Sequence, residues 1–171
     1  INMYKMIFVI FLAAVLSYTK EQKTSETTPG EVSLKTDSNF LSMKINGQLW
    51  EADHDIVGAF HPKGYDQLII IGGSSGKKDK SEKSFTVNIY KTNGPGKYNF
   101  VKGNPTLSVA QMGNWSEEEY LCGSMMGFDV SFDVTKASKN PTIVEATFSG
   151  KLTCPSGKEL LITEGKFYYE E

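Results

Sequence analysis

Apolar and polar residues alternate with a period of two in several parts of the chain. In the segment 128–135 every second residue is Phe or Val, and the residues between them are Asp, Ser or Thr. The segment 85–90 alternates in the same way. Successive side chains of a strand point to opposite faces, so each segment predicts a strand with one buried face. We expect the apolar positions of the two segments to share a core: Phe85, Val87, Ile89, Phe128, Val130 and Phe132.

Turn-forming residues separate these segments from other short apolar runs. Asn46-Gly47 between 43–45 and 48–50 predicts a hairpin, because Asn-Gly tolerates the positive φ angles of a type I′ turn. The β-branched run 67–73 predicts a strand buried on both faces, followed by a charged loop over 74–83. Further strands are expected at 56–61, 97–100, 107–112, 142–152 and 159–168. No sustained helical repeat is present, so the pattern favours an antiparallel β-sandwich or a lipocalin-like β-barrel.

The first 17 residues have a different pattern. Lys5 is followed by an unbroken apolar run over 6–16 and by the small residue Ser17. This order is typical of a secretory signal peptide, and the run is shorter than the roughly 20 residues that span a bilayer. We predict cleavage after Ser17, a flexible polar tether over 18–39 and one antiparallel β domain over 40–171. Position 18 is Tyr, so the chain lacks the acylated cysteine of a lipoprotein there.

Export to the periplasm, the outer-membrane surface or the extracellular space follows from the signal peptide. The formal net charge is only −2, and all 18 basic residues are Lys. Arg is the residue best suited to bidentate recognition of phosphate, so we do not expect nucleic acid as a partner. No motif calls for a cofactor, and we expect membrane association only through an anchor or a partner.

Cys122 and Cys154 are the two cysteines of the chain, and each lies at the end of an expected strand. In an oxidising compartment we predict a disulfide between them. Two buried thiols acting as small apolar residues are the alternative. A catalytic cysteine is disfavoured because no His lies near either residue in the sequence.

The residue types that ligate metals gather in Asp53-His54-Asp55, with His61 further along. A continuous strand would place the two histidines on opposite faces, and no further Cys or His completes a tetrahedral site. We therefore expect solvated surface residues and no metal. The run 117–119 of three glutamates lacks the spacing of a calcium loop, so a solvated acidic loop is expected.

Aromatic residues outside the expected core are the best candidates for ligand binding. Trp115 lies in a polar loop, where its ring has no obvious core to join, and Tyr120 and Tyr65 are the other two candidates. Such rings can stack on sugars or on apolar ligands while the polar group of the side chain remains hydrated. The glycine-rich stretch 72–76 does not open a helix and is predicted to be a flexible loop mouth.

Four short motifs carry a family resemblance: Met-Lys-Ile-Asn-Gly-Gln-Leu-Trp at 43–50 with Ala52, Gly-Pro-Gly-Lys-Tyr at 94–98, Phe-Ser-Gly at 148–150 and Ile-Thr-Glu-Gly-Lys-Phe at 162–167. Together they resemble the small exported β-domains, often lipoproteins, of Bacteroidetes. The resemblance implies an envelope location and an all-β fold. It supplies no catalytic residue, and Tyr18 departs from the lipoprotein pattern.

The function hypothesis that follows is an exported cell-envelope module that binds an envelope protein, a glycan or an apolar small ligand without catalysis. No nucleophile–base pair or metal constellation is apparent in the sequence. The alternatives are a secreted hydrolase that uses surface carboxylates such as Asp129, Asp133 or Glu117, and a purely structural envelope subunit.

Overall fold

The computed structural model describes residues 38–171, so the predicted signal peptide and nearly all of the predicted tether lie outside the described residues. The described part is built from strands, and the first begins at Phe40. No helix in residues 38–171 has the length and apolar character needed to cross a membrane. The strands are β1 (Phe40–Ile45), β2 (Gln48–Glu51), β3 (His54–Lys63), β4 (Asp66–Ser75), β5 (Lys83–Tyr90), β6 (Gly96–Val101), β7 (Val109–Gly113), β8 (Leu121–Gly123), β9 (Phe128–Lys139), β10 (Thr142–Thr153) and β11 (Glu159–Glu170).

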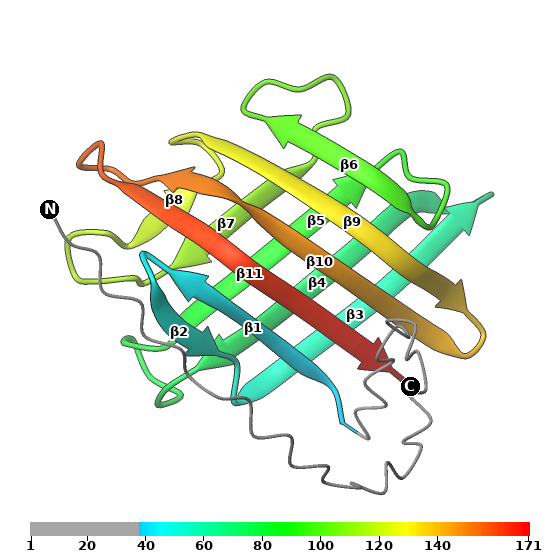
Figure 1. Cartoon of the computed structure of the whole chain (residues 1–171), viewed down its shortest axis with the longest axis horizontal. Coiled ribbons are helices and arrows are strands. Elements are labelled where there is room, and N and C mark those ends of the chain that lie inside the picture. The colour runs from blue at the N-terminus through cyan, green and yellow to red at the C-terminus, as the bar shows by residue number, and fades with distance from the viewer. Residues whose placement is uncertain (1–37) are drawn as a thin grey trace, which may run out of the picture. The chain divides into compact units, whose positions relative to one another are not determined.

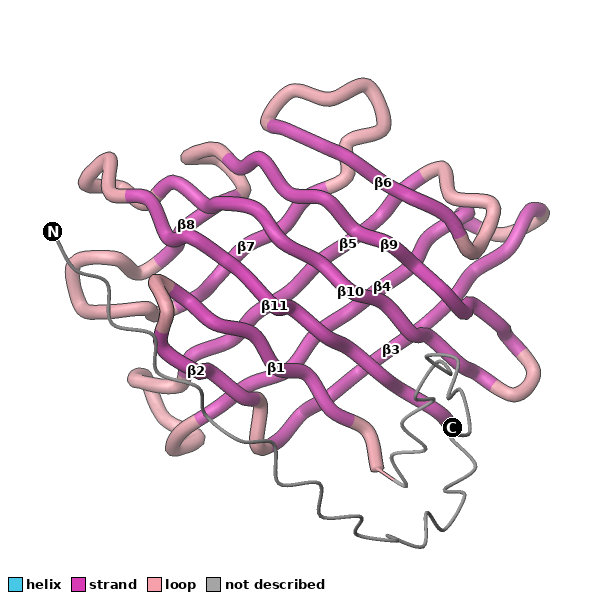
Figure 2. Tube along the Cα trace, in the orientation of Figure 1, coloured by secondary structure: helices cyan, strands magenta, loops and turns pink. Residues whose placement is uncertain are grey.

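These strands form two antiparallel sheets that lie face to face (Figure 1). The six-stranded sheet has the order β2-β1-β11-β10-β9-β6, and the five-stranded sheet has the order β3-β4-β5-β7-β8. The strands of one sheet run across those of the other (Figure 2). The hairpin β1–β2 pairs with β11, so the beginning and the end of the domain lie side by side in one sheet.

The core between the sheets consists of the apolar positions that alternate along the strands, and the six core residues named from the sequence are all buried. Phe85 of the five-stranded sheet stacks on Phe148 of the six-stranded sheet with ring centroids 5.4 Å apart. Phe148 stacks on Phe132 at 5.0 Å, and Phe132 on Phe100 at 5.6 Å. A row of stacked rings therefore lies within a largely aliphatic core. Because the strands form two separate sheets packed face to face, the domain adopts the β-sandwich of the two predicted folds.

The predicted disulfide joins the two sheets. Cys122 lies on β8 and Cys154 directly follows β10, with an S–S distance of 2.01 Å and a Cα–Cα distance of 4.0 Å. Both residues are almost fully buried. The disulfide prediction is confirmed, and the alternative of two free thiols is wrong.

The motifs behind the family resemblance have structural roles. Asn46 and Gly47 both have positive φ, as the predicted turn requires. The Tyr98 hydroxyl donates to the Gly94 carbonyl, which closes the turn that leads into β6. Gly165 lies against the Phe148 ring. A side chain does not fit here, because a Cβ at this position would come within 2.4 Å of Phe148 Cδ2. These short motifs are therefore explained by turns and close packing.

Several predicted boundaries differ from the structure, and three of the differences have a clear physical reason. Strand β4 continues to Ser75, and Gly72 and Gly73 are buried within it, so the stretch 72–76 is not a loop mouth. A Cβ at Gly73 would approach Ala52 Cβ to 2.7 Å, so close packing explains the glycine here. The strand expected at 107–112 starts only at Val109, because Leu107 has a φ of 62° and belongs to a turn. Strand β3 extends through Pro62, which an edge strand tolerates.

Candidate functional site

A hollow of about 450 Å³ lies between the β7–β8 loop and the segment that leads into β5. Two of the three predicted ligand-binding residues, Trp115 and Tyr120, line it together. The other lining residues are polar or charged: Lys80, Ser81, Lys83, Asn114, Ser116 and Glu117. The hollow therefore combines two aromatic rings with a rim of hydrogen-bonding groups.

The two aromatic residues are held differently. Tyr120 is 58% exposed, whereas Trp115 is partly buried and packs against the core. The Lys83 ammonium lies over the Trp115 ring at 4.7 Å from its centroid. A cation over an aromatic face is attracted by the ring quadrupole, so Lys83 helps to fix the orientation of the indole. A molecule entering the hollow meets an aromatic surface and a positive donor in the same place.

The β7–β8 loop is anchored by hydrogen bonds at several points. The Asn114 N–H donates to the Tyr120 carbonyl at 2.9 Å, and the Glu119 N–H donates to Ser116 Oγ at 3.2 Å. The Glu119 side chain reaches inward, where its Oε1 accepts a hydrogen bond from the Ser156 hydroxyl. The loop is thereby joined to the turn that follows Cys154 in the other sheet, so its aromatic residues are largely preorganised.

The prediction of a fully solvated acidic loop over 117–119 is wrong for Glu119. Its neighbours Glu117 and Glu118 are exposed, but Glu119 is only 5% exposed. Its Oε2 is buried without a hydrogen-bond partner. The prediction failed because the sequence does not show that Ser156, from a distant turn, lies within reach of this carboxylate.

Tyr65 lies outside the hollow. It sits in the turn between β3 and β4, whereas the hollow lies beyond the other end of β4, so roughly 30 Å of strand separates them. Tyr65 is 63% exposed, and the Lys139 ammonium lies 3.3 Å from the centroid of its ring. Hydrogen bonding and the positive charge of Lys139 lower the pKa of the Tyr65 hydroxyl. The structure thus places Tyr65 beside Lys139 and apart from the hollow that Trp115 and Tyr120 line.

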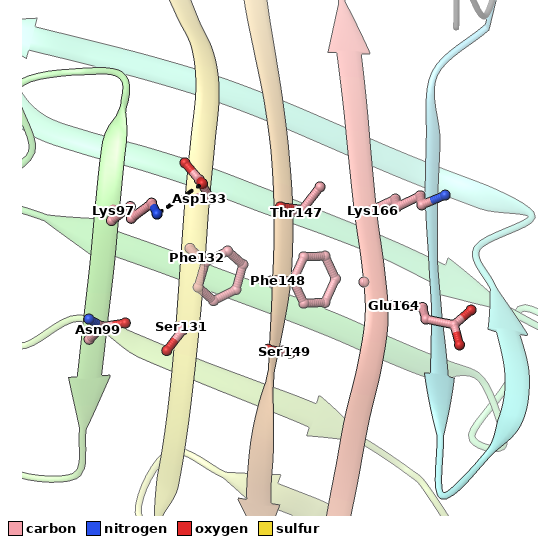
Figure 3. Close-up of a pocket in the computed structure, with 11 residues that line it drawn as sticks. Lys97, Asn99, Ser131, Phe132, Asp133, Thr147, Phe148, Ser149, Glu164 and Lys166 are labelled. Atoms are coloured by element: carbon pink, nitrogen blue, oxygen red, sulfur yellow. Dashed lines mark ion pairs between the residues drawn. The ribbon is translucent and has the colours of Figure 1, made fainter. Parts of the chain in front are cut away.

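Outward-facing side chains of the six-stranded sheet line a second hollow of about 480 Å³ (Figure 3). Asp133 lies here with Lys97 Nζ 3.9 Å from its Oδ2, beside small residues such as Ser131 and Ser149. Phe132 and Phe148 also border this hollow, but both are buried in the core. This second hollow therefore offers polar groups, and the two rings that border it belong to the core.

The carboxylates considered for hydrolysis do not form a pair. Asp129 and Asp133 both lie on the outward face of β9, as predicted, but they are four positions apart along the strand, which separates them by about 13 Å. The paired carboxylates of glycosidases lie about 5–9.5 Å apart. Glu117 lies in the β7–β8 loop, which belongs to the other sheet. The three groups do not converge on one substrate position.

A separate cluster forms where β3 begins. Both ring nitrogens of His54 face carboxylates: Nδ1 contacts Asp53 Oδ1, and Nε2 lies 2.5 Å from Glu82 Oε1. Asp55 Oδ2 lies 3.8 Å from the same Nε2, and Asp55 Oδ1 accepts a hydrogen bond from Lys78 at 2.9 Å. His61, the other histidine, lies near Asp66 at the opposite end of β3. The two histidines therefore do not form one site.

Hydrogen bonding sets the protonation behaviour of this cluster. The bond to Glu82, followed by the bond to Asp53, raises the pKa of His54. The N–H of Gly76 donates to Asp53 at 3.1 Å and, together with His54, lowers the pKa of that carboxyl. A hydrogen bond from Lys78 lowers the pKa of Asp55.

Sequence reasoning missed Lys83 and Glu82, because both lie in a segment treated only as a charged loop running into a strand. Their partners are distant in the chain: Glu82 meets His54 across 28 positions, and Lys83 meets Trp115 in the loop after β7. No local spacing encodes either contact.

Comparisons of the chain with protein-family models, curated proteins and solved structures found no match.

Proposed function

We propose that the protein is an exported, non-catalytic module of the cell envelope that binds a glycan in the hollow lined by Trp115 and Tyr120. One observation carries this proposal: two aromatic residues from one anchored loop share a single hollow of about 450 Å³ with polar side chains. Ligand sites commonly combine aromatic surface with a few placed polar groups.

The character of the lining favours a glycan over an apolar ligand. Only Trp115 and Tyr120 are aromatic, and every other lining residue carries a hydroxyl, amide, ammonium or carboxylate group. A sugar ring can lie with its C–H groups against an aromatic ring while its hydroxyls bond to the rim. An apolar ligand would leave the Lys80 and Lys83 ammonium groups partly desolvated without a partner.

The fold and the predicted export agree with a binding role. A disulfide that joins two sheets is the kind of crosslink that persists in oxidising compartments, which is consistent with the predicted signal peptide. The binding loop is tied to the same region, since Glu119 contacts Ser156 two residues after Cys154. A preorganised loop loses less conformational entropy when a ligand binds.

A glycan array run beside a panel of chromogenic glycosidase and esterase substrates tests the proposed function. We expect saturable binding to a subset of glycans and no turnover. Turnover that disappears in Asp129→Asn or Asp133→Asn, with the fold intact, would replace the binding role with the hydrolase alternative. Silence on both the array and the substrate panel would favour a structural envelope subunit.

A further inference from the structure

The cluster at the start of β3 has no part in the proposed glycan site, yet it brings together three residue types that ligate metals. His54, Asp55 and Glu82 each offer one donor atom, and these atoms all lie within 4.8 Å of one another. A second group of donor types, Glu119 with Cys122 and Cys154, is unsuitable because the disulfide consumes both thiols. The His54 cluster is the stronger candidate.

We propose that His54, Asp55 and Glu82 bind a divalent transition-metal ion of the Zn²⁺ class. The ligand atoms are Nε2 of the imidazole, Oδ2 of Asp55 and Oε1 of Glu82. Zinc binds His nitrogen and carboxylate oxygen at about 2.0–2.2 Å, so tetrahedral ligand atoms lie roughly 3.4 Å apart. The present separations of Nε2 from the two oxygens, 2.5 and 3.8 Å, lie on either side of that value.

Asp53 supports this assignment from behind the ring. Metal-binding histidines usually donate the other ring N–H to a carboxylate, which fixes the orientation of the ring. Asp53 contacts Nδ1 of His54 in this way, and its second oxygen accepts a hydrogen bond from the Gly76 N–H at 3.1 Å. Nε2 is thereby directed toward Asp55 and Glu82.

The charges around the cluster are compatible with a bound cation. Lys78 is the neighbouring cation, but its ammonium bonds to Oδ1 of Asp55, whereas Oδ2 faces His54. The side chains of Lys78 and Asp55 are 64% and 58% exposed, so Lys78 can move toward solvent when a metal ion binds. With Asp53 included, three carboxylates surround the site, and their charge favours a dication.

The nitrogen donor selects among cations. Calcium and magnesium prefer oxygen ligands, whereas imidazole suits zinc and its neighbours in the transition series. Three protein ligands leave a fourth position for water, and the exposed side of Asp55 is open to solvent. Metal binding would tie β3 to the segment before β5, and that segment already meets the β7–β8 loop through the bond from Asn114 Nδ2 to the Glu82 carbonyl.

The test is calorimetric titration of the chelator-treated full chain with ZnCl2 and, separately, with CaCl2. We expect one Zn²⁺ per chain and weaker or undetectable Ca²⁺ binding. His54→Gln and Glu82→Gln should each weaken Zn²⁺ binding at least about tenfold, since losing even a supporting residue of a metal site typically costs 10–100-fold. Far-UV circular dichroism checks that each variant stays folded, and Glu82→Gln preserves the side-chain shape.

His61→Gln is the matched control, because His61 is the second histidine and lies near Asp66 at the other end of β3. It should leave Zn²⁺ affinity unchanged. Excess Zn²⁺ should raise the thermal midpoint of the wild type and of His61→Gln, but not that of His54→Gln. The proposal is overturned if no saturable Zn²⁺ binding occurs, if His61→Gln weakens binding as much as His54→Gln, or if Ca²⁺ binds as tightly as Zn²⁺.

Discussion

Replacing Phe132 by Ala removes the centre of the aromatic stack that joins the two sheets. Phe132 is 1% exposed, and its ring lies 5.0 Å from that of Phe148 and 5.6 Å from that of Phe100. The next residue along β9, Asp133, points to the opposite face, where Lys97 Nζ lies 3.9 Å from its Oδ2. The pair therefore compares the two faces of one strand at adjacent positions.

The structure sets the expected magnitudes. Truncating a buried Phe to Ala costs about 3–5 kcal/mol through lost transfer energy and the cavity left behind. Two stacked partners place Phe132 at the upper end, because each aromatic pair adds about 0.5–1.5 kcal/mol beyond burial. An exposed ion pair contributes about 0–1 kcal/mol, so Asp133→Ala should cost less than about 1 kcal/mol.

Urea denaturation followed by tryptophan fluorescence measures both losses. A domain stability of about 5–15 kcal/mol makes Phe132→Ala a severe change, so Phe132→Leu is included as a milder variant that keeps the domain folded. We expect the free energy of unfolding to decrease in the order wild type, Asp133→Ala, Phe132→Leu and Phe132→Ala. Equal losses for Phe132→Ala and Asp133→Ala would refute the assignment of the two faces.

Three further predictions concern the crosslink, the isolated tyrosine and the N-terminus. Replacing both Cys122 and Cys154 by Ser should lower the free energy of unfolding by about 3–4 kcal/mol, because the disulfide closes a loop with a sequence separation of 32 and so restricts the unfolded chain. An unchanged urea midpoint would contradict this. In a spectrophotometric pH titration Tyr65 should ionise below the ordinary tyrosine pKa, and Lys139→Gln should move its midpoint upward, because Lys139 favours the anionic hydroxyl; an unmoved midpoint would show that Lys139 is not the cause. Intact-mass analysis of exported protein should give a chain that begins at Tyr18, and a chain that retains residues 6–16 would disprove the signal peptide.

The fold was largely predictable because its main determinant is local. The period of two along 85–90 and 128–135 identifies which side chains face the core, and all of the predicted core positions are buried. Boundaries were less predictable where packing decides them. The predicted strand 67–73 is right to include Gly73, but the loop mouth predicted over 72–76 is not, because β4 continues to Ser75. Gly73 lacks a side chain because a Cβ there would clash with Ala52, a contact between segments far apart in the sequence.

The candidate site was predictable only in part. A tryptophan in a polar loop is an anomaly that the sequence displays, so Trp115 could be selected, and Tyr120 lies on the same loop. Tyr65 was selected on the same chemical grounds, but strand length places it at the other end of β4. Lys83 and Glu82 could not be found, because their contacts with Trp115 and His54 arise only when the chain folds.

Glycan binding at the β7–β8 loop is the central claim, and calorimetry with the glycan that responds most strongly on the array tests it most directly. Tyr120→Ala removes a ring that is 58% exposed, so the fold should survive, and Trp115→Ala removes the second ring. Each should weaken affinity by roughly tenfold or more, as expected for an aromatic group at the centre of a binding site. Tyr65→Ala, which removes an equally exposed ring at the far end of β4, should leave affinity unchanged. Equal losses at Tyr65 and Tyr120, or no saturable binding by the wild type, would contradict the account.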